Sequence, residues 1–210
     1  MKFVPLAPET LAVRIARWID RRSPARLRIG VDGPPEVGTT ELTDRIAAEL
    51  NSLNRPTIRV SGHFWLRAAS LRLEYGRQDP QSRLTGWVDA QSLAREVFDP
   101  LGSHGDGRHL TRLRDPATDR AIREGYAQAP ANSVLLFDSS MVLTLGFDWD
   151  AVIRVGVSTG ALQRALPERS QWELGVYAEY RDEWQSEHPA DLVVSYDHPS
   201  SPAISGLDLR

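Results

Sequence analysis

The sequence predicts a single α/β domain of three layers, α/β/α, in which helices cover both faces of a parallel sheet. Two patterns indicate this fold. Short apolar runs bounded by turn residues alternate along the chain with longer segments of helical periodicity, as in parallel sheets with crossover helices. No repeat, low-complexity tract or clear linker interrupts the 210 residues, which are enough for one core but a tight fit for two domains.

The first expected element is an amphipathic helix at residues 9–22. Leu11, Ile15 and Trp18 recur at helical spacing on one face, and arginines occupy the other. We interpret residues 1–24 as an N-terminal helical extension of a single domain spanning 1–210, packed on the flank of that domain.

Five strands and three further helices are expected after this extension. The strands are at 26–32, 57–62, 133–140, 150–158 and 190–197. The helices are at 39–53, 88–101 and 159–188, and Pro167 interrupts the last. The remaining segments are less regular: 63–87 indicates a loop with one helical stretch, 102–121 a turn-rich segment with a hairpin strand at 108–115, and 198–210 a loop or an edge.

The composition excludes several function classes. A hydrophobic content of 41% and a charged content of 25% are those of an ordinary globular protein. The net charge of −3 does not favour nucleic acid or a membrane surface as a partner, and the absence of cysteine excludes disulfides and cysteine-ligated metals. No apolar run has the length of a signal peptide core or a membrane span, so a cytoplasmic location is expected. The sequence does not indicate an oligomeric state.

A glycine-rich turn, GPPEVGTT at residues 33–40, connects the first predicted strand to the helix at 39–53. It has the spacing of the phosphate-binding pattern G-x-x-x-x-G-K-[ST], in which backbone N–H groups and a lysine hold phosphates and the Ser/Thr hydroxyl holds magnesium. Gly33, Gly38 and Thr40 match this pattern. Thr39 stands in the place of the lysine, and Glu36 puts a negative charge where a phosphate would approach.

Two interpretations of this turn stay open. It is either a loop derived from a phosphate binder or a structural turn of a common type. The only lysine of the chain is Lys2, so no internal lysine can serve a phosphate site. The strand-loop-helix context favours the first interpretation, which concerns the fold and ancestry of the loop and not its present activity.

From residue 30 onward, several sequence blocks in matching order resemble the uridine kinase family of P-loop nucleoside kinases, especially its shorter actinobacterial-type members. The blocks begin at residues 27, 57, 88, 108, 133 and 190 and read LRIGVDGPPEVGTTELTDRIAAEL, TIRVSGHFWLR, VDAQSLAREVFDPLG, RHLTRLRDPATDR, SVLLFDSSMVL and ADLVVSYDHPSSP. The resemblance implies a P-loop NTPase-like fold, ATP and Mg²⁺ as cofactors, and phosphoryl transfer to the 5′-hydroxyl of a pyrimidine nucleoside.

The resemblance also assigns roles to the residues of the turn. Gly33, Gly38, Thr39 and Thr40 correspond to the loop that binds ATP, and Thr40 corresponds to the magnesium ligand. Asp138, at the end of the third core strand, corresponds to an acidic residue that supports the reacting groups. Thr39 departs from the family, whose members carry lysine at this position.

A second departure falls on the catalytic base. Where the family has two aspartates followed by Phe-His, this chain has His63 and Phe64, then Trp65 and Leu66. The base and the magnesium-linked carboxylates are therefore absent. His63 is a candidate base because neutral imidazole accepts a proton near pH 7, although a histidine at a strand end is more often a structural or surface residue.

The cations of the expected site are a third departure. The family's arginine-rich lid matches LQRALPERS, which leaves Arg164 and Arg169 as candidate catalytic arginines. Arg67, Arg72 or Arg77 could approach the phosphates in place of the lysine, but we favour the interpretation that they are solvated loop arginines.

Three functions are consistent with this sequence. We favour a non-catalytic relative that binds a ligand or a partner, because the departures concentrate at the chemistry and spare the scaffold. Losing one strong charge contact on a transition state typically costs about a hundredfold or more in rate, and two losses would approach the loss of useful turnover. The alternatives are a nucleoside kinase with substitute residues and a kinase for another small molecule.

Overall fold

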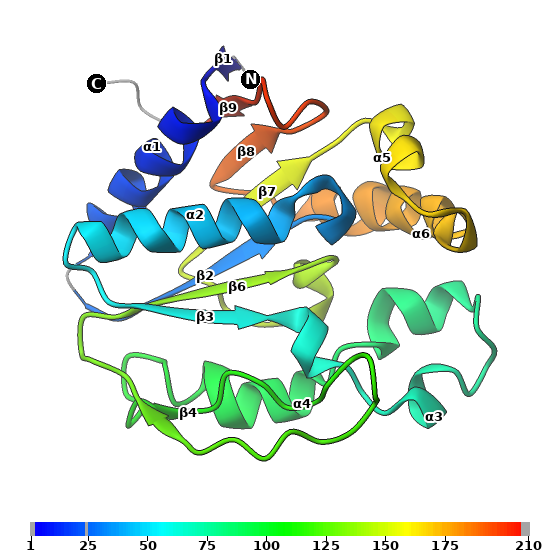
Figure 1. The fold of residues 1–210 in the computed structure, drawn as a ribbon, viewed down its shortest axis with the longest axis horizontal. Coiled ribbons are helices and arrows are strands. Elements are labelled where there is room, and N and C mark those ends of the chain that lie inside the picture. The colour runs from blue at the N-terminus through cyan, green and yellow to red at the C-terminus, as the bar shows by residue number, and fades with distance from the viewer. Residues whose placement is uncertain (1–2, 24, 207–210) are drawn as a thin grey trace.

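The computed structural model describes residues 3–23 and 25–206, and its centre is a seven-stranded sheet of order β1-β9-β8-β7-β2-β6-β3 (Figure 1). Its strands are β1 (Val4–Pro5), β2 (Leu27–Asp32), β3 (Thr57–Ser61), β6 (Val134–Ser139), β7 (Ala151–Gly156), β8 (Leu192–Ser195) and β9 (Ala203–Ser205). Strands β3, β6, β2, β7 and β8 are parallel, and β9 and β1 add an antiparallel edge. The predicted α/β fold and its five parallel strands are confirmed. Strand β1, of two residues, was not predicted, and β9, of three residues, lies in the segment 198–210 that was expected to form a loop or an edge.

Helices cover both faces of the sheet. They are α1 (Pro8–Asp20), α2 (Thr39–Ser52), α3 (Ala69–Arg72), α4 (Ala90–Leu93), α5 (Thr159–Ala165) and α6 (Glu173–Tyr180). Alternate residues of β6 point to opposite faces, as the pleat of a strand requires. Val134 and Leu136 pack in one core with α1 and α2, whereas Leu135 and Phe137 pack in a second core with α4 and the segment after it.

Helix α1 belongs to the main core of the domain. Leu11, Ile15 and Ile19 are completely buried, and they share one hydrophobic cluster with α2 and β2. Strand β1, just before the helix, pairs with β9 and so ties this part of the chain into the sheet. Each buried Leu or Ile stabilises the folded state by roughly 1.5–3 kcal/mol relative to an exposed one. Helix α1 is therefore an integral part of the domain.

The segments between strands are more irregular than their helical patterns predict. The predicted helix at 88–101 begins as α4, with Asp89 accepting a hydrogen bond from the Ser92 N–H, but continues as a π-helix, η4 (Ala94–Phe98). Residues 63–87 contain α3, part of a 3₁₀ turn η2 (Gly62–Trp65) and a π-helical turn η3 (Ser82–Gly86). A two-residue ladder joins β4 (Arg108–His109) to β5 (Ala127–Gln128).

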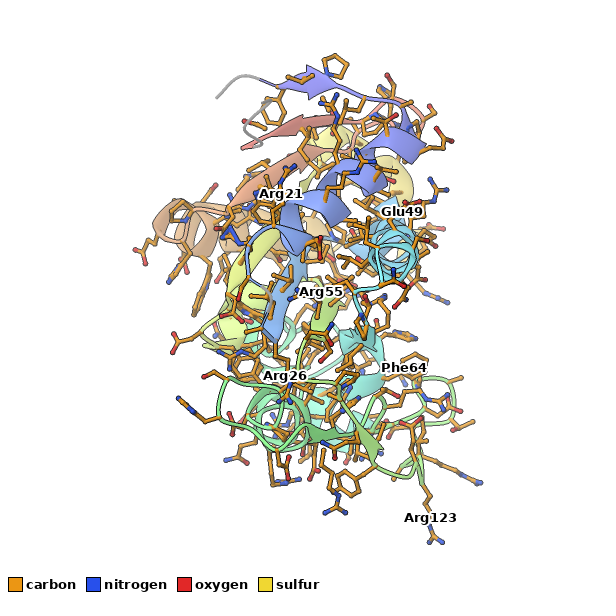
Figure 2. The ribbon with its side chains drawn as sticks, turned by 90° about the vertical axis from the view of Figure 1, so that its left-hand side faces the viewer. Arg21, Arg26, Glu49, Arg55, Phe64 and Arg123 are labelled. Carbon is orange, nitrogen blue, oxygen red and sulfur yellow. The ribbon has the colours of Figure 1, made fainter. Side chains whose placement is uncertain are left out.

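Several arginines serve as structural cations. Arg55, which follows α2, points into the body of the protein (Figure 2), where its guanidinium donates to the Ala25 carbonyl at 2.5 Å and lies 4.0 Å from Asp20. Arg123, in contrast, extends away from the domain into solvent (Figure 2).

No helix in the described part of the chain is both long enough and apolar enough to span a membrane.

Candidate functional site

The glycine-rich loop lies where the carboxyl ends of the parallel strands meet the start of α2 (Figure 1). It leaves β2 at Asp32, forms a short 3₁₀ turn η1 (Pro35–Val37), and enters α2 through Gly38. Gly38 has a φ of 94°, a left-handed conformation that favours glycine. In open α/β sheets, this edge is where ligands bind.

The backbone N–H groups of this loop donate hydrogen bonds within the protein. The Gly33 N–H donates to the Ser139 carbonyl at 3.1 Å, and the Gly38 N–H donates to the Pro35 carbonyl at 3.0 Å. The Val37 N–H makes a longer bond, 3.4 Å, to the Pro34 carbonyl. A phosphate cradle needs such groups turned inward and available, and here those of Gly33, Val37 and Gly38 are already used.

Thr39, at the lysine position, fastens the loop to itself. Its hydroxyl donates to the Pro34 carbonyl at 2.7 Å and is buried with the rest of the side chain. Its carbonyl in turn accepts a bond from the Thr43 hydroxyl at 2.8 Å. A Cβ placed on Gly33 would lie 2.8 Å from the Thr39 Oγ1, so the hydroxyl closely abuts the first glycine of the loop. A lysine at this position would reach toward a ligand, whereas Thr39 closes the loop.

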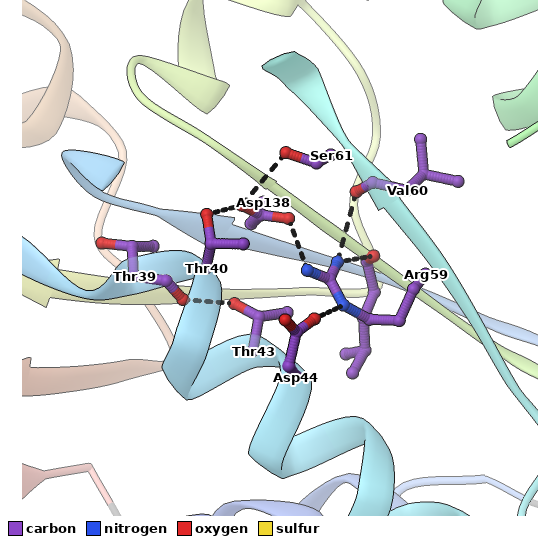
Figure 3. A network of polar contacts seen from close by, with 9 residues as sticks. Thr39, Thr40, Thr43, Asp44, Arg59, Val60, Ser61 and Asp138 are labelled. Carbon is purple, nitrogen blue, oxygen red and sulfur yellow. Dashed lines mark hydrogen bonds and ion pairs between the residues drawn. The ribbon is translucent and has the colours of Figure 1, made fainter. Parts of the chain in front are cut away.

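Asp138 and Thr40 meet beside the loop in a polar network (Figure 3). The Thr40 hydroxyl donates to Asp138 Oδ2 at 2.7 Å, and the Ser61 hydroxyl donates to the same oxygen at 3.3 Å. Asp138 Oδ1 forms an ion pair with Arg59 Nη2 at 2.8 Å. The structure therefore brings together two of the predicted residues, Asp138 and Thr40, and adds a cation that the sequence analysis did not single out.

Arg59 is held firmly in this network (Figure 3). Its Nε donates to Asp44 Oδ1 at 2.8 Å, and its Nη1 donates to the Leu136 carbonyl at 3.0 Å. The guanidinium thus pairs with Oδ1 of Asp138, while the Thr40 hydroxyl bonds to Oδ2 of the same carboxylate. Within residues 3–23 and 25–206, no three His, Asp or Glu side chains form a cluster that could hold a metal ion by themselves. Asp138 Oδ2 and the hydroxyls of Thr40 and Ser61 are oxygen donors of the kind that Mg²⁺ prefers, but Arg59 already pairs with the other oxygen of Asp138.

The position that follows β3 cannot carry a carboxylate in this conformation. A Cβ on Gly62 would overlap Ser139 Oγ and lie 2.7 Å from Ser139 Cβ. His63, the candidate base, is exposed, and its ring meets the edge of the Phe64 ring at 5.6 Å. The hydrogen bonds from the Ala117 and Thr118 N–H groups lower the pKa of Asp115 in the neighbouring segment.

The two predicted lid arginines lie on the surface. Arg164, on α5, is exposed, and its guanidinium lies along its own helix, 3.6 Å from the point where a Cβ on Gly160 would lie. Arg169, on the 3₁₀ turn η6 (Glu168–Ser170), is also exposed. The structure does not bring either of them into the network of Asp138. Their catalytic role stays a prediction.

A second arginine that the sequence analysis did not single out spans the mouth of the site. Arg83, on η3, forms a buried ion pair with Glu173 of α6 at 2.6 Å, and donates to the Ser140 and Tyr177 hydroxyls at 3.1 and 3.3 Å. Its guanidinium also faces the Trp87 ring at 4.8 Å. The cation is therefore committed to protein partners from three segments of the chain.

The charges of Arg83 and Glu173 also act on Glu36 of the loop. Partial burial raises the pKa of the Glu36 carboxyl, and the negative charge of Glu173 raises it further, while Arg83 opposes both effects.

Comparison with known proteins identifies the architecture. No protein-family model matches the chain, and no curated protein matches it either. A protein assigned as a fructose transport system kinase from Silicibacter sp. TM1040 shares 21% identity with a TM-score of 0.65, over 90% of this chain and 98% of the other. The fold is that of P-loop kinases.

Two further solved structures share this P-loop kinase fold. A protein assigned as a uridine kinase from Bacillus stearothermophilus has a TM-score of 0.66 at 14% identity, covering 88% of this chain and 98% of its own. The YGR205w protein has a TM-score of 0.55 at 9% identity, covering 95% and 97%. At these identities the likeness concerns the fold alone.

Proposed function

We propose that this chain is a non-catalytic member of the P-loop kinase fold. Its phosphate loop acts as a structural turn, and the protein works as a ligand-binding or partner-binding module. In this proposal ATP and Mg²⁺, the cofactors implied by resemblance to uridine kinases, are not bound with useful affinity. The scaffold is retained because its core does not depend on the residues that carry the chemistry.

The observation that carries this proposal is the ion pair between Arg59 and Asp138, 2.8 Å apart beside Thr40. Phosphoryl transfer needs cations that are aimed at the substrate phosphates, because they must neutralise charge that develops there in the transition state. A guanidinium fixed to the sheet by Asp44 and the Leu136 carbonyl neutralises Asp138 instead. It supplies its charge to the protein and offers none to a ligand.

The closed loop supports the same conclusion independently. The Thr39 hydroxyl and the N–H groups of Gly33, Val37 and Gly38 satisfy acceptors of the protein. A phosphate that used these three N–H groups would have to break their present bonds. Removing a single anion-stabilising donor from a kinase or hydrolase site typically costs about a hundredfold in rate, and here several are committed at once.

The test is a phosphoryl-transfer assay with purified protein, magnesium and γ-labelled ATP. Acceptors would be a panel of nucleosides, sugars and pantothenate-type alcohols, with an authentic uridine kinase assayed in parallel. The matched variants are Thr40→Ala, which removes the residue in the magnesium position, and Thr85→Ala, whose hydroxyl bonds only within its own exposed turn. We expect the wild type and both variants to show the same background.

Transfer by the wild type that Thr40→Ala abolishes and Thr85→Ala preserves would refute the proposal. The nucleoside kinase with substitute residues would then be the correct function if nucleosides are labelled. Labelling of another acceptor would favour the small-molecule kinase. In either case Arg83 would become the first candidate for the missing cation.

A further inference from the structure

A cavity of about 120 Å³ lies beneath the glycine-rich loop, on the face of the sheet that α6 covers. Its lining comes from the ends of β2 and β7, from α5, from α6, and from the π-helical turn η7 (Arg181–Gln185) that follows. It is separate from the network of Arg59 and Asp138. π-helical turns are rare, and they occur frequently at functional sites because they re-aim side chains.

The floor of the cavity is a buried carboxyl group. Asp32 is completely buried and accepts hydrogen bonds from the Val142 N–H and from Gln185 Nε2, both at 3.1 Å. The Tyr180 hydroxyl is a further partner. A carboxylate has about four acceptor positions, so these three donors leave one of them unfilled.

The charge near this floor favours a neutral donor over a cation. Arg154 lies directly opposite Asp32 on the neighbouring strand β7, and its guanidinium donates to the His188 carbonyl at 2.9 Å. Its positive charge lowers the pKa of Asp32, which burial raises more strongly. A ligand N–H or O–H would satisfy the remaining acceptor without adding a second positive charge.

The walls and the mouth differ in chemistry from the floor. The buried side chains of Leu162 of α5 and Tyr180 of α6 line the cavity. Ala178, between Tyr177 and Tyr180 on α6, also lines it. Arg181 lies at the exposed rim, where its side chain is half exposed. Its ion pair with Asp182, at 3.4 Å between two exposed side chains, is of the kind that contributes little. A ligand anion could therefore replace Asp182 as the partner of Arg181.

The volume limits the ligand to one ring. An engineered apolar cavity of about 150 Å³ in another protein binds benzene, whereas sites for larger ligands span about 300–1,000 Å³. We propose that this cavity binds a small aromatic acid whose ring carries a neutral N–H or O–H donor opposite the acidic group. The donor meets Asp32, the ring lies between Leu162 and Tyr180, and the acidic group pairs with Arg181.

The test uses three matched probes in titration calorimetry with the full chain. 4-Aminobenzoate has the ring, the donor and the acid, benzoate lacks the donor, and aniline lacks the acid. We expect saturable binding of 4-aminobenzoate and about tenfold weaker binding of each of the other two, since each lacks one hydrogen-bonded contact. Equal affinity for all three, or no saturable binding of 4-aminobenzoate, would overturn the proposal.

Two variants locate the ligand. Arg181→Gln should remove the preference for 4-aminobenzoate over aniline, and Ala178→Trp should fill the cavity and abolish binding of both. Arg17→Gln removes an exposed arginine from α1 on the opposite face and should change nothing. Retained binding in a folded Ala178→Trp variant would overturn the assignment. If circular dichroism shows that Ala178→Trp is unfolded, the Arg181→Gln variant decides the question. An unchanged preference of that variant for 4-aminobenzoate over aniline would overturn the assignment.

This inference does not depend on the proposed function. The probes contain no phosphate, and the assay contains no nucleotide. A positive phosphoryl-transfer assay would refute the non-catalytic proposal and leave the cavity to be judged by these titrations alone.

Discussion

Arg59 lies in an edge strand, yet its guanidinium reaches over the sheet to a carboxylate on the neighbouring strand. Its side chain is 22% exposed and that of Asp138 is 3% exposed. Sequence analysis did not single it out because polar residues that alternate with apolar ones in a strand are expected to face water. The pairing with Asp138 depends on strand order, since β6 lies beside β3 but is separated from it along the chain by the whole irregular middle segment. No local pattern encodes that adjacency.

Replacing Arg59 with methionine should destabilise the protein by about 3 kcal/mol, because the substitution leaves Asp138 buried without its cation. The measurement is the free energy of unfolding in urea. Arg95→Met is the matched control, since its pair with Glu96 is at the surface and the arginine side chain is 67% exposed. That control should cost less than about 1 kcal/mol. Equal effects of the two substitutions would show that Asp138 does not need Arg59.

Asp32 should make the stability depend on pH. Burial raises its pKa above the ordinary value of 3.8, so the folded state keeps the proton at pH values where the unfolded chain has lost it. Its contribution to the free energy of unfolding is therefore full below pH 3.8 and declines as pH rises through the folded-state pKa. As the pH rises through this range, we expect the free energy of unfolding of the wild type to fall relative to that of Asp32→Asn. Urea unfolding of both proteins at a series of pH values measures it, and a constant difference would contradict the expectation.

At the scale of elements, the periodicity of apolar residues predicted the strands and helices that form the core. It did not predict the short strands and the irregular turns. The parallel strands and the helix after the loop were predicted because each presents a continuous apolar run or stripe to the core. Strands β1 and β9 are too short to show alternation. The turn η3, which carries Arg83, has no periodicity of its own, because its position follows from contacts with α6 and with the end of β6. Gly62 shows the same limit, since only the structure reveals that Ser139 fills the space beside it.

Arg83 should couple η3 to α6. We expect Arg83→Met to accelerate backbone hydrogen exchange in residues 82–86 and 173–180 by about tenfold, because the substitution removes the ion pair and hydrogen bonds that join these segments. Hydrogen-exchange mass spectrometry measures it. Arg77→Met, an exposed arginine in the same irregular segment, is the control and should leave both regions unchanged. Acceleration confined to residues 82–86 would show that α6 is held by other contacts.

At the scale of the whole molecule, magnesium and ATP should not stabilise the fold. A ligand that binds only the folded state raises its stability by mass action, by about 2.7 kcal/mol at a hundred times its Kd. We expect the same melting temperature with magnesium, with ATP, with both and with EDTA. Differential scanning calorimetry measures it. A rise with magnesium and ATP together that is absent in Thr40→Ala would contradict the expectation.

The fold was more predictable than the site for a physical reason. Burial of apolar faces repeats along the chain and leaves a periodic record, so the architecture and the position of the loop follow from the pattern of residues. The site depends on single contacts between distant segments. The threonine at the lysine position of the pattern was visible in the sequence, but the hydrogen bond from the Thr39 hydroxyl to the Pro34 carbonyl was not.

The ion pair of Arg59 and Asp138 has a consequence for how the protein behaves in changing surroundings. A site completed by nucleotide and magnesium tracks their supply, so its shape and lifetime vary between growth and starvation. Here the counter-ion is encoded in the chain and present at a fixed ratio of one to one. In the proposed non-catalytic protein, the conformation around β3 and β6 is therefore constitutive, so whatever the protein recognises meets one surface whether ATP is abundant or scarce.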